Sequence, residues 1–295
     1  MSTTYADLGD EVVGREREIE LLLAALGAGA HVVLEGPPGT GKTTLLRAVA
    51  ARQHVPFIFV EGNAELTPGR LVGHFDPAQV LAQGYKPEIF VDGPLIEAMR
   101  SGGLLYIEEL NRVPEETLNV LLTSMSEGEV HVPRLGAVKA AEGFSFVAAM
   151  NPYDSVGTAR ISGAIYDRTC RIAMGYQTPE AEDRIAELRG PEVPAEWRAK
   201  VVELIRATRQ HSDVRVGSSV RGVIDLLGVA SQLAGSRGSD ITDWHLGLDA
   251  ATVALSGRIR LHESCSRTPE AVVRELYEGI FGREPREDDD ESGEA

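Results

Sequence analysis

Cysteine is scarce in this sequence, which has only Cys170 and Cys265 among 295 residues, and the two lie far apart. So few cysteines argue against a disulfide framework and suit reduced thiols in a cytosolic protein. The seven histidines are scattered, and no pair at a metal-ligand spacing also has a cysteine or acidic partner. We therefore expect no zinc site.

Long apolar runs are also missing. Apolar stretches such as residues 32–34 and 144–150 fall far short of the roughly 18 residues that a membrane span needs. The first ten residues carry acids and lack the basic-then-apolar order of a secretory signal. The expected location is therefore cytoplasmic, with no membrane segment.

Positive charge is in the minority, because 29 basic residues face 45 acidic ones and the formal net charge is -16. This balance repels a polyanion, so a nucleic-acid partner is unexpected unless a local basic groove exists. Residues 287–295 contain six acids and no base. We expect residues 285–295 to form a disordered acidic tail, more plausibly a solubilising segment than a docking motif.

What the sequence does contain is the pattern of an α/β domain. Residues Ile19, Leu22, Leu23 and Leu26 have the spacing of one helix face. Helical patterns separate most of the strand-like runs, which predicts a parallel sheet covered on both faces. The strand-like runs are residues 31–35, 55–62, 103–109, 144–150 and 171–177.

After Gln177 the strand signals cease. Two segments, 178–180 and 268–270, read Thr-Pro-Glu, which is typical of a helix N-cap followed by first-turn proline and acid. The predicted organisation is an α/β core over residues 1–177 and a smaller all-α domain over residues 178–284.

The segment GPPGTGKT, residues 36–43, matches the phosphate-binding loop pattern G-x-x-x-x-G-K-[ST] and stands between a predicted strand and a predicted helix. Its glycines let backbone N–H groups turn toward phosphates, and Lys42 would reach the β and γ phosphates while Thr43 would ligate Mg²⁺. The predicted ATP-binding residues here are Pro38, Gly39, Thr40, Gly41, Lys42, Thr43 and Thr44.

A second chemical element is the apolar run of residues 104–107 that ends in Glu108 and Glu109. Paired acids at the end of a strand can serve a metal and an attacking water. We assign Glu108 to the metal and Glu109 to activation of the water. A pair of surface charges is the alternative, and the phosphate loop upstream favours the functional reading.

Four blocks in order, GPPGTGKT, YIEELNRVP, AAMNP and SGAIYDRT, make the chain resemble the MoxR branch of AAA+ ATPases, which are related to the magnesium-chelatase ATPase subunit. The resemblance covers about residues 12–234. It implies a P-loop AAA+ core, followed by a helical lid. This chain differs where the family usually has Asp-Glu, because it has Glu108-Glu109 instead.

The resemblance also implies roles for residues outside the loop. Asn151 would be the sensor that helps to place the water, and Arg168 the arginine finger for a neighbouring subunit's γ phosphate. Arg221 would be the second sensor in the lid, and Val13 and Gly14, after Val12, would border adenine. Ordinary alternatives are a turn at Asn151, an ion pair of Arg168 with Asp167 and a surface position for Arg221.

The alternating segment 127–139 predicts a β-hairpin, which in this family points toward the ring pore or partner; a plain surface hairpin is the alternative. The implied function is Mg²⁺-dependent ATP hydrolysis by a hexameric ring that remodels or activates a partner protein, such as one with a von Willebrand factor A domain. Two alternatives are the motor subunit of a metal chelatase and a nucleotide-gated binding scaffold with little hydrolysis.

Overall fold

The computed structural model describes residues 12–151 and 163–285 and divides the chain into two compact units, Met1–Gly175 and Tyr176–Ala295. The division lies two residues before the boundary that the sequence suggested after Gln177. The predicted acidic tail falls outside the described residues except for residue 285.

The first unit is built on a five-stranded sheet in which every pairing is parallel. This confirms the predicted α/β fold, since parallel neighbours need crossover connections over the faces of the sheet. The last strand begins two residues earlier than the sequence suggested and ends at Ala173. The strand order is β2 (Phe57–Glu61), β5 (Leu104–Glu108), β8 (Ser145–Met150), β1 (His31–Glu35) and β9 (Thr169–Ala173).

Alternate side chains of the central strands enter two separate hydrophobic cores, one on each face of the sheet. On β1, Val32 and Leu34 join the core that contains α1 (Glu16–Gly27) and α2 (Lys42–Gln53). Val33 joins the opposite core, which helices on the other face of the sheet complete. Those elements are α3 (Pro68–Val72), α5 (Pro94–Ser101), η3 (Leu110–Arg112), α6 (Glu115–Glu127) and α7 (Gly163–Tyr166).

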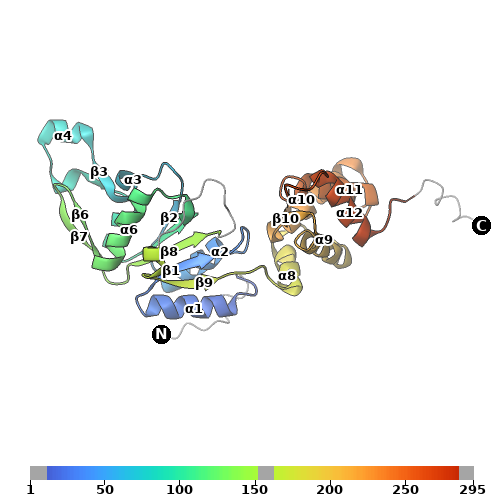
Figure 1. Cartoon of the computed structure of the whole chain (residues 1–295), viewed down its shortest axis with the longest axis horizontal. Coiled ribbons are helices and arrows are strands. Elements are labelled where there is room, and N and C mark those ends of the chain that lie inside the picture. Colours follow the sequence, from blue (N-terminus) through green and yellow to red (C-terminus); the bar gives the residue numbers. More distant parts are fainter. Residues whose placement is uncertain (1–11, 152–162, 286–295) are drawn as a thin grey trace, which may run out of the picture. The chain divides into compact units, whose positions relative to one another are not determined.

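Two small antiparallel pairs project from this unit (Figure 1). One pairs β3 (Gly73–Phe75) with β4 (Phe90–Asp92), and the chain between them forms α4 (Pro77–Gln83) and η2 (Pro87–Ile89). The other is the hairpin of β6 (Glu129–Val132) and β7 (Gly136–Lys139), which confirms the hairpin predicted over residues 127–139. The guanidinium of Arg134 in the hairpin turn lies 3.8 Å from the ring centre of Tyr85, so the two projections touch.

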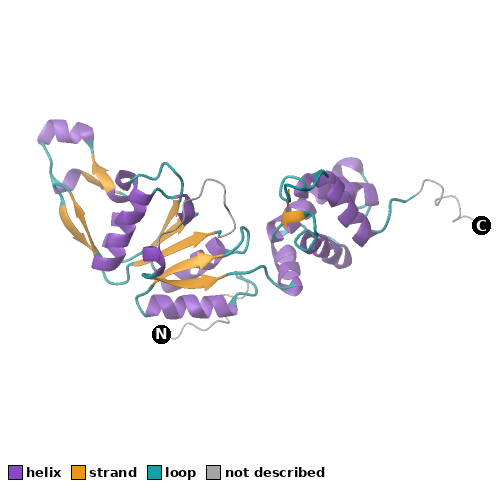
Figure 2. Cartoon of the chain, viewed as in Figure 1, coloured by secondary structure: helices purple, strands orange, loops and turns teal. Residues whose placement is uncertain are grey.

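The second unit is almost entirely helical (Figure 2). Thr178 and Thr268 accept backbone N–H groups at the starts of their helices, as the Thr-Pro-Glu segments predicted. Apolar faces of these helices share one core. The helices are α8 (Pro179–Arg189), α9 (Ala195–Ala207), α10 (Val220–Arg237), α11 (Trp244–Leu255) and α12 (Pro269–Phe281).

The expectation that no strand follows Gln177 is wrong at one place. The short strands β10 (Val214–Val216) and β11 (Arg260–Leu261) pair antiparallel across two interhelical connections. Strands this short carry too little periodicity for a sequence pattern to reveal them. Within residues 12–151 and 163–285, no helix has both the length and the apolar character to cross a membrane.

Candidate functional site

The phosphate loop lies between the end of β1 and the first residue of α2, as the sequence predicted. Gly39 and Gly41 have φ angles of 73° and 86°, a region in which residues with a side chain are strained. Gly36 is needed for a different reason, because a Cβ there would lie 2.1 Å from the carbonyl oxygen of Met174. Gly39 and Gly41 therefore allow the tight turn of the loop, and Gly36 allows its start to pack against Met174, which follows β9. Pro38 and Thr44 are exposed on this loop and the first turn of α2.

Lys42 is 8% exposed and folds back over the loop. Its Nζ donates to the carbonyl oxygens of Gly36 and Pro37, both at 2.8 Å. Burial lowers the pKa of Lys42 to about 8; the carboxylate of Glu108 opposes this effect and the guanidinium of Arg15 adds to it. The lysine thus stays protonated at neutral pH, with its charge facing the inside of the loop.

The two predicted metal-binding residues lie in direct contact. Thr43 Oγ1 donates to Glu108 Oε1 at 3.1 Å, although the two residues are 65 positions apart in the chain. Tyr106 lies on the same strand as Glu108, and its hydroxyl is 3.2 Å from Thr43 Oγ1. A hydroxyl and a carboxylate are the oxygen ligands that suit Mg²⁺, which keeps several waters and binds phosphates as well.

No group of three or more His, Cys, Asp or Glu side chains suited to a metal occurs among the residues that the structure describes. The Thr43–Glu108 pair fits a Mg²⁺ that nucleotide phosphates and water would complete, since Mg²⁺ is usually bound by one or two carboxylates together with phosphates. Burial also raises the pKa of the Tyr106 hydroxyl, which keeps it a neutral hydrogen-bonding group beside this pair.

Glu109, the proposed water-activating acid, has an unusual backbone. Its φ angle of 54° lies in the left-handed region, where a residue with a side chain costs on the order of 1 kcal/mol or more. Its Oε2 lies 3.1 Å from Nε of Arg112. Arg112 was not predicted from the sequence, because an arginine three residues from an acid is a common pattern with no distinctive signal.

Gly62, the residue after β2, allows the backbone of Glu108 and Glu109 to lie very close to the end of that strand. Its N–H donates to the Glu108 carbonyl oxygen at 2.7 Å. A Cβ on Gly62 would lie 2.6 Å from that oxygen and 2.7 Å from the carbonyl oxygen of Glu109. Sequence reasoning missed this residue, because a single glycine after a strand does not show what approaches it.

Asn151 follows β8 directly and is half-buried, and β8 lies between β5 and β1 in the sheet. Because the N–H of Gly36 donates to the Met150 carbonyl oxygen at 3.1 Å, the end of β8 adjoins the start of the phosphate loop. The structure thus brings Asn151, the loop and the two acids to the same edge of the sheet.

Arg168 lies two residues beyond α7 and is exposed. The block SGAIYDRT that contains it begins at residue 162, which lies outside the described residues; the helix that the structure describes within this block is the four-residue α7. The Arg168 side chain donates to Ser126 Oγ at 2.5 Å and to the Ala164 carbonyl oxygen at 3.0 Å. It is therefore on the surface of the first unit, where these two contacts hold its side chain.

The segment before α1 contains Val12, Val13 and Gly14, which the resemblance placed beside adenine. Val12 is buried, Val13 is half-buried, and Gly14 has a φ angle of 65°. The next residue, Arg15, is 3% exposed and donates to the Thr40 carbonyl oxygen in the phosphate loop at 2.9 Å. Arg15 was not predicted from the sequence, because an arginine beside the charged start of a helix usually lies on the surface.

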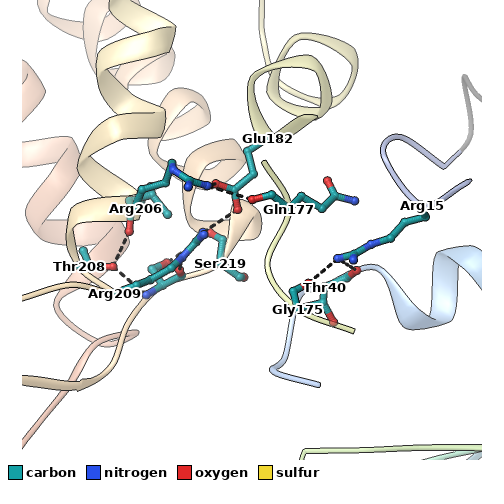
Figure 3. Close-up of polar contacts among 11 residues, drawn as sticks. Arg15, Thr40, Gly175, Gln177, Glu182, Arg206, Thr208, Arg209 and Ser219 are labelled. Atoms are coloured by element: carbon teal, nitrogen blue, oxygen red, sulfur yellow. Dashed lines mark hydrogen bonds and ion pairs between the residues drawn. The ribbon is translucent and has the colours of Figure 1, made fainter. Parts of the chain in front are cut away.

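Arg221 belongs to the second unit, where it is the exposed second residue of α10. The chain just before α10 is held by a buried polar cluster that was not predicted. Glu182, 2% exposed, forms ion pairs with Arg206 at 3.0 Å and Arg209 at 2.8 Å (Figure 3). Arg209 also donates from Nε to the Ser218 carbonyl oxygen at 2.6 Å. The cluster thus holds the residues that precede α10, the helix that carries Arg221.

Comparison with known proteins shows what this chain is similar to in sequence. Residues 31–169 match the family model described as AAA domain (dynein-related subfamily). The protein YeaC of Bacillus subtilis, which is uncharacterised, is 28% identical over 92% of this chain and 91% of its own length. The gas vesicle ATPase GvpN of Haloferax mediterranei is 28% identical over 65% of this chain and 60% of its own length.

Solved structures support the fold. A candidate ATPase from Cytophaga hutchinsonii aligns over 92% of both chains with a TM-score of 0.50 and 22% identity. The Holliday junction branch migration motor RuvB of Thermotoga maritima aligns over 81% of this chain and 67% of its own with a TM-score of 0.52 and 18% identity. Identities this low show a shared fold and no more. Residues 31–169, a little under half of the chain, are thus similar in sequence to an AAA domain of the dynein-related subfamily, and the solved structures show a shared fold.

Proposed function

We propose that this protein binds ATP with Mg²⁺ and hydrolyses it. The observation that carries the proposal is the contact of Thr43 with Glu108 at 3.1 Å beside the buried ammonium of Lys42. A hydroxyl, a carboxylate and a cation around a glycine-rich loop form the set that phosphoryl transfer in P-loop enzymes needs. AAA domains in general supply this chemistry, which is consistent with the family match.

The residues divide the work by their chemistry. Lys42 and the loop N–H groups bind the phosphates, and Thr43 and Glu108 hold Mg²⁺, which neutralises phosphate charge when bound. Glu109 takes the proton of the attacking water, and Asn151 helps to place that water. Val13 and Gly14 border the adenine, and Arg221 in the lid is the second sensor.

The finer assignment is a hexameric ring of the MoxR type in the cytoplasm. The core, residues 1–177, carries the nucleotide, residues 178–284 form the lid, and residues 285–295 form an acidic tail. Arg168 acts on the γ phosphate of a neighbouring subunit, which its exposed position on the first unit supports. The ring remodels or activates a partner protein, such as one with a von Willebrand factor A domain.

A specific contact favours a second candidate, a nucleotide-gated binding scaffold with little hydrolysis. The carboxylate of Glu109 is 3.1 Å from Nε of Arg112, and this ion pair has to open before the carboxylate can take a proton from water. Glu108, in place of the aspartate that the MoxR family usually has, points in the same direction. Among the described residues, no feature specifically favours the other alternative, the motor subunit of a metal chelatase.

The deciding experiment measures phosphate release and nucleotide binding on the same preparation, with and without Mg²⁺, over a range of protein concentrations. The proposal expects tight ATP binding, turnover only with Mg²⁺, and turnover per subunit that rises as the ring assembles. Binding without measurable turnover at any concentration would favour the scaffold. Absence of ATP binding would end both candidates.

A further inference from the structure

Arg15 is a charged side chain buried almost completely in the first unit. It occupies the N-cap position of α1 and is only 3% exposed. Burying a guanidinium is costly unless its donors find acceptors, so its partners indicate what this arrangement achieves.

Its partners come from three separate parts of the chain. Nη1 donates to Glu18 Oε1 at 2.8 Å, within the first turn of α1. Nη2 donates to two backbone carbonyl oxygens, that of Thr40 at 2.9 Å and that of Gly175 at 2.7 Å (Figure 3). A single nitrogen atom therefore connects the phosphate loop to the last residue of the first unit.

The contact with Thr40 has a direct consequence for phosphate binding. The peptide bond between Thr40 and Gly41 is planar and trans, so its carbonyl oxygen and its N–H point in opposite directions. When Arg15 holds the Thr40 oxygen, it also fixes the direction of the Gly41 N–H. Gly41 begins α2 as its N-cap, and N–H groups at this position of a phosphate loop bind phosphate.

The contact with Gly175 reaches the point where the chain leaves the first unit. The next residues are held within the second unit by two arginines. The Arg209 guanidinium lies 3.9 Å from the ring centre of Tyr176, and Arg206 donates to the Gln177 carbonyl oxygen at 3.0 Å. Gly175 is thus held by a residue of the first unit, and Tyr176 and Gln177 are held by residues of the second.

We infer that Arg15 is a positioning residue that holds the Gly41 N–H for phosphate and couples the phosphate loop to the linker at Gly175. The inference rests on the proposed nucleotide function. Arg15 acts through the backbone and does not touch the nucleotide. A lysine could bind one of the two carbonyls, but it lacks the planar fork that serves Thr40, Gly175 and Glu18 together.

The test compares wild type, Arg15→Met and Arg15→Lys by calorimetry with ADP and by hydrogen exchange of backbone amides. In wild type, ADP should slow exchange in the phosphate loop and alter it at Tyr176 and Gln177. In Arg15→Met, affinity should fall about tenfold, the factor that one hydrogen bond to a charged group is worth. The change at the linker should disappear even at saturating ADP, which a general loss of stability would not produce.

Glu18→Gln is the matched control. It removes the ionic partner of Arg15 and keeps both backbone contacts, so affinity and the linker response should remain within twofold of wild type. If Arg15→Met does not fold, Arg15→Lys decides the question, because it keeps a cation at the site and should still weaken the linker response.

Two outcomes lead to different conclusions. If wild type binds no nucleotide, the proposed function itself fails. If wild type binds ADP, and folded Arg15→Met or Arg15→Lys binds it equally well with the same exchange change at the linker, only the role of Arg15 is wrong.

Discussion

The ammonium group of Lys42 is the most strongly perturbed charge in the nucleotide site. Burial lowers its pKa from 10.5 to about 8. Between these values the unfolded chain binds more protons than the folded chain, so the contribution of Lys42 to stability improves as the pH rises from about 8 to 10.5. The protein thus maintains an unfavourable charge at neutral pH, a cost that binding of a phosphate can offset.

This predicts a pH dependence of nucleotide affinity. The dissociation constant for ADP should be flat just below pH 8 and should rise above it, by up to about tenfold per pH unit, because phosphate then has to bind a deprotonated lysine. Calorimetry between pH 7.5 and about pH 9.5 measures this rise. Lys42→Arg is the control, since arginine stays charged throughout. A wild-type curve parallel to that of Lys42→Arg would contradict the prediction.

Glu109 and Glu108 allow a paired test of the two acids. Glu109→Gln keeps size and hydrogen bonding but removes basicity, so ATP should bind with Mg²⁺ while turnover falls by about 10² or more. Glu108→Gln should instead weaken the Mg²⁺ dependence, because its Oε1 contacts Thr43 at 3.1 Å. Phosphate release as a function of Mg²⁺ concentration separates them. Full turnover in Glu109→Gln would mean that the two roles are exchanged.

The close approach of β2 and β5 where they end makes Gly62 a structural requirement of the site. In Gly62→Ala the new Cβ would start 2.6 Å from the Glu108 oxygen, so the backbone of the acidic pair must shift. We expect a loss of about 1–3 kcal/mol in the free energy of unfolding and a clear fall in turnover. Gly69→Ala is the control, because its nearest atom is 4.0 Å away. Equal activity of both variants would contradict this account of the strand ends.

Helices α8 and α9 are joined by the buried carboxylate of Glu182. In Glu182→Ala, Arg206 and Arg209 lose this partner, and breaking a buried pair in this way costs about 3–5 kcal/mol. Because Arg206 is 29% exposed, we expect the lower end of that range. Denaturant unfolding followed by hydrogen exchange should locate the loss in the second unit. Glu187→Ala, on the same helix in an exposed pair, should change stability by less than about 1 kcal/mol.

In the proposed ring, two neighbouring subunits contribute residues to each ATP site. Two inactive variants can test this. Arg168→Ala should lose about 10³-fold or more in turnover and keep ATP binding, since the arginine serves a neighbour's γ phosphate. Lys42→Ala should lose ATP binding and keep its arginine finger. A mixture should regain part of the turnover, because some interfaces then combine an intact loop with an intact finger.

Phosphate release across mixing ratios measures this recovery, and native mass spectrometry verifies that the variants assemble together. Co-assembled rings that stay inactive at every ratio would contradict a shared site. Arg168→Lys serves as the conservative variant and should recover only part of the rate, because an ammonium lacks the guanidinium fork.

The sequence alone determined the features that depend on neighbouring residues. The segment 36–43 predicted the phosphate loop because positive φ angles require glycine locally, as Gly39 and Gly41 show. The alternation of strand-like runs with helical patterns predicted the parallel sheet. The Thr-Pro-Glu segments predicted two helix starts, which Thr178 and Thr268 cap. These signals lie within one strand, turn or helix, so they are readable along the chain.

Only the tertiary structure decided which distant groups meet. Thr43 and Glu108 are 65 positions apart, and Arg15 reaches Gly175 across 160 positions. Neither separation leaves a pattern in one sequence, because contact between such residues depends on strand order and on how the elements pack. From the sequence, Arg15 and Glu182 would be expected on the surface, but both are buried in the structure. A charged side chain is stable in the interior only where folding brings its partners to it.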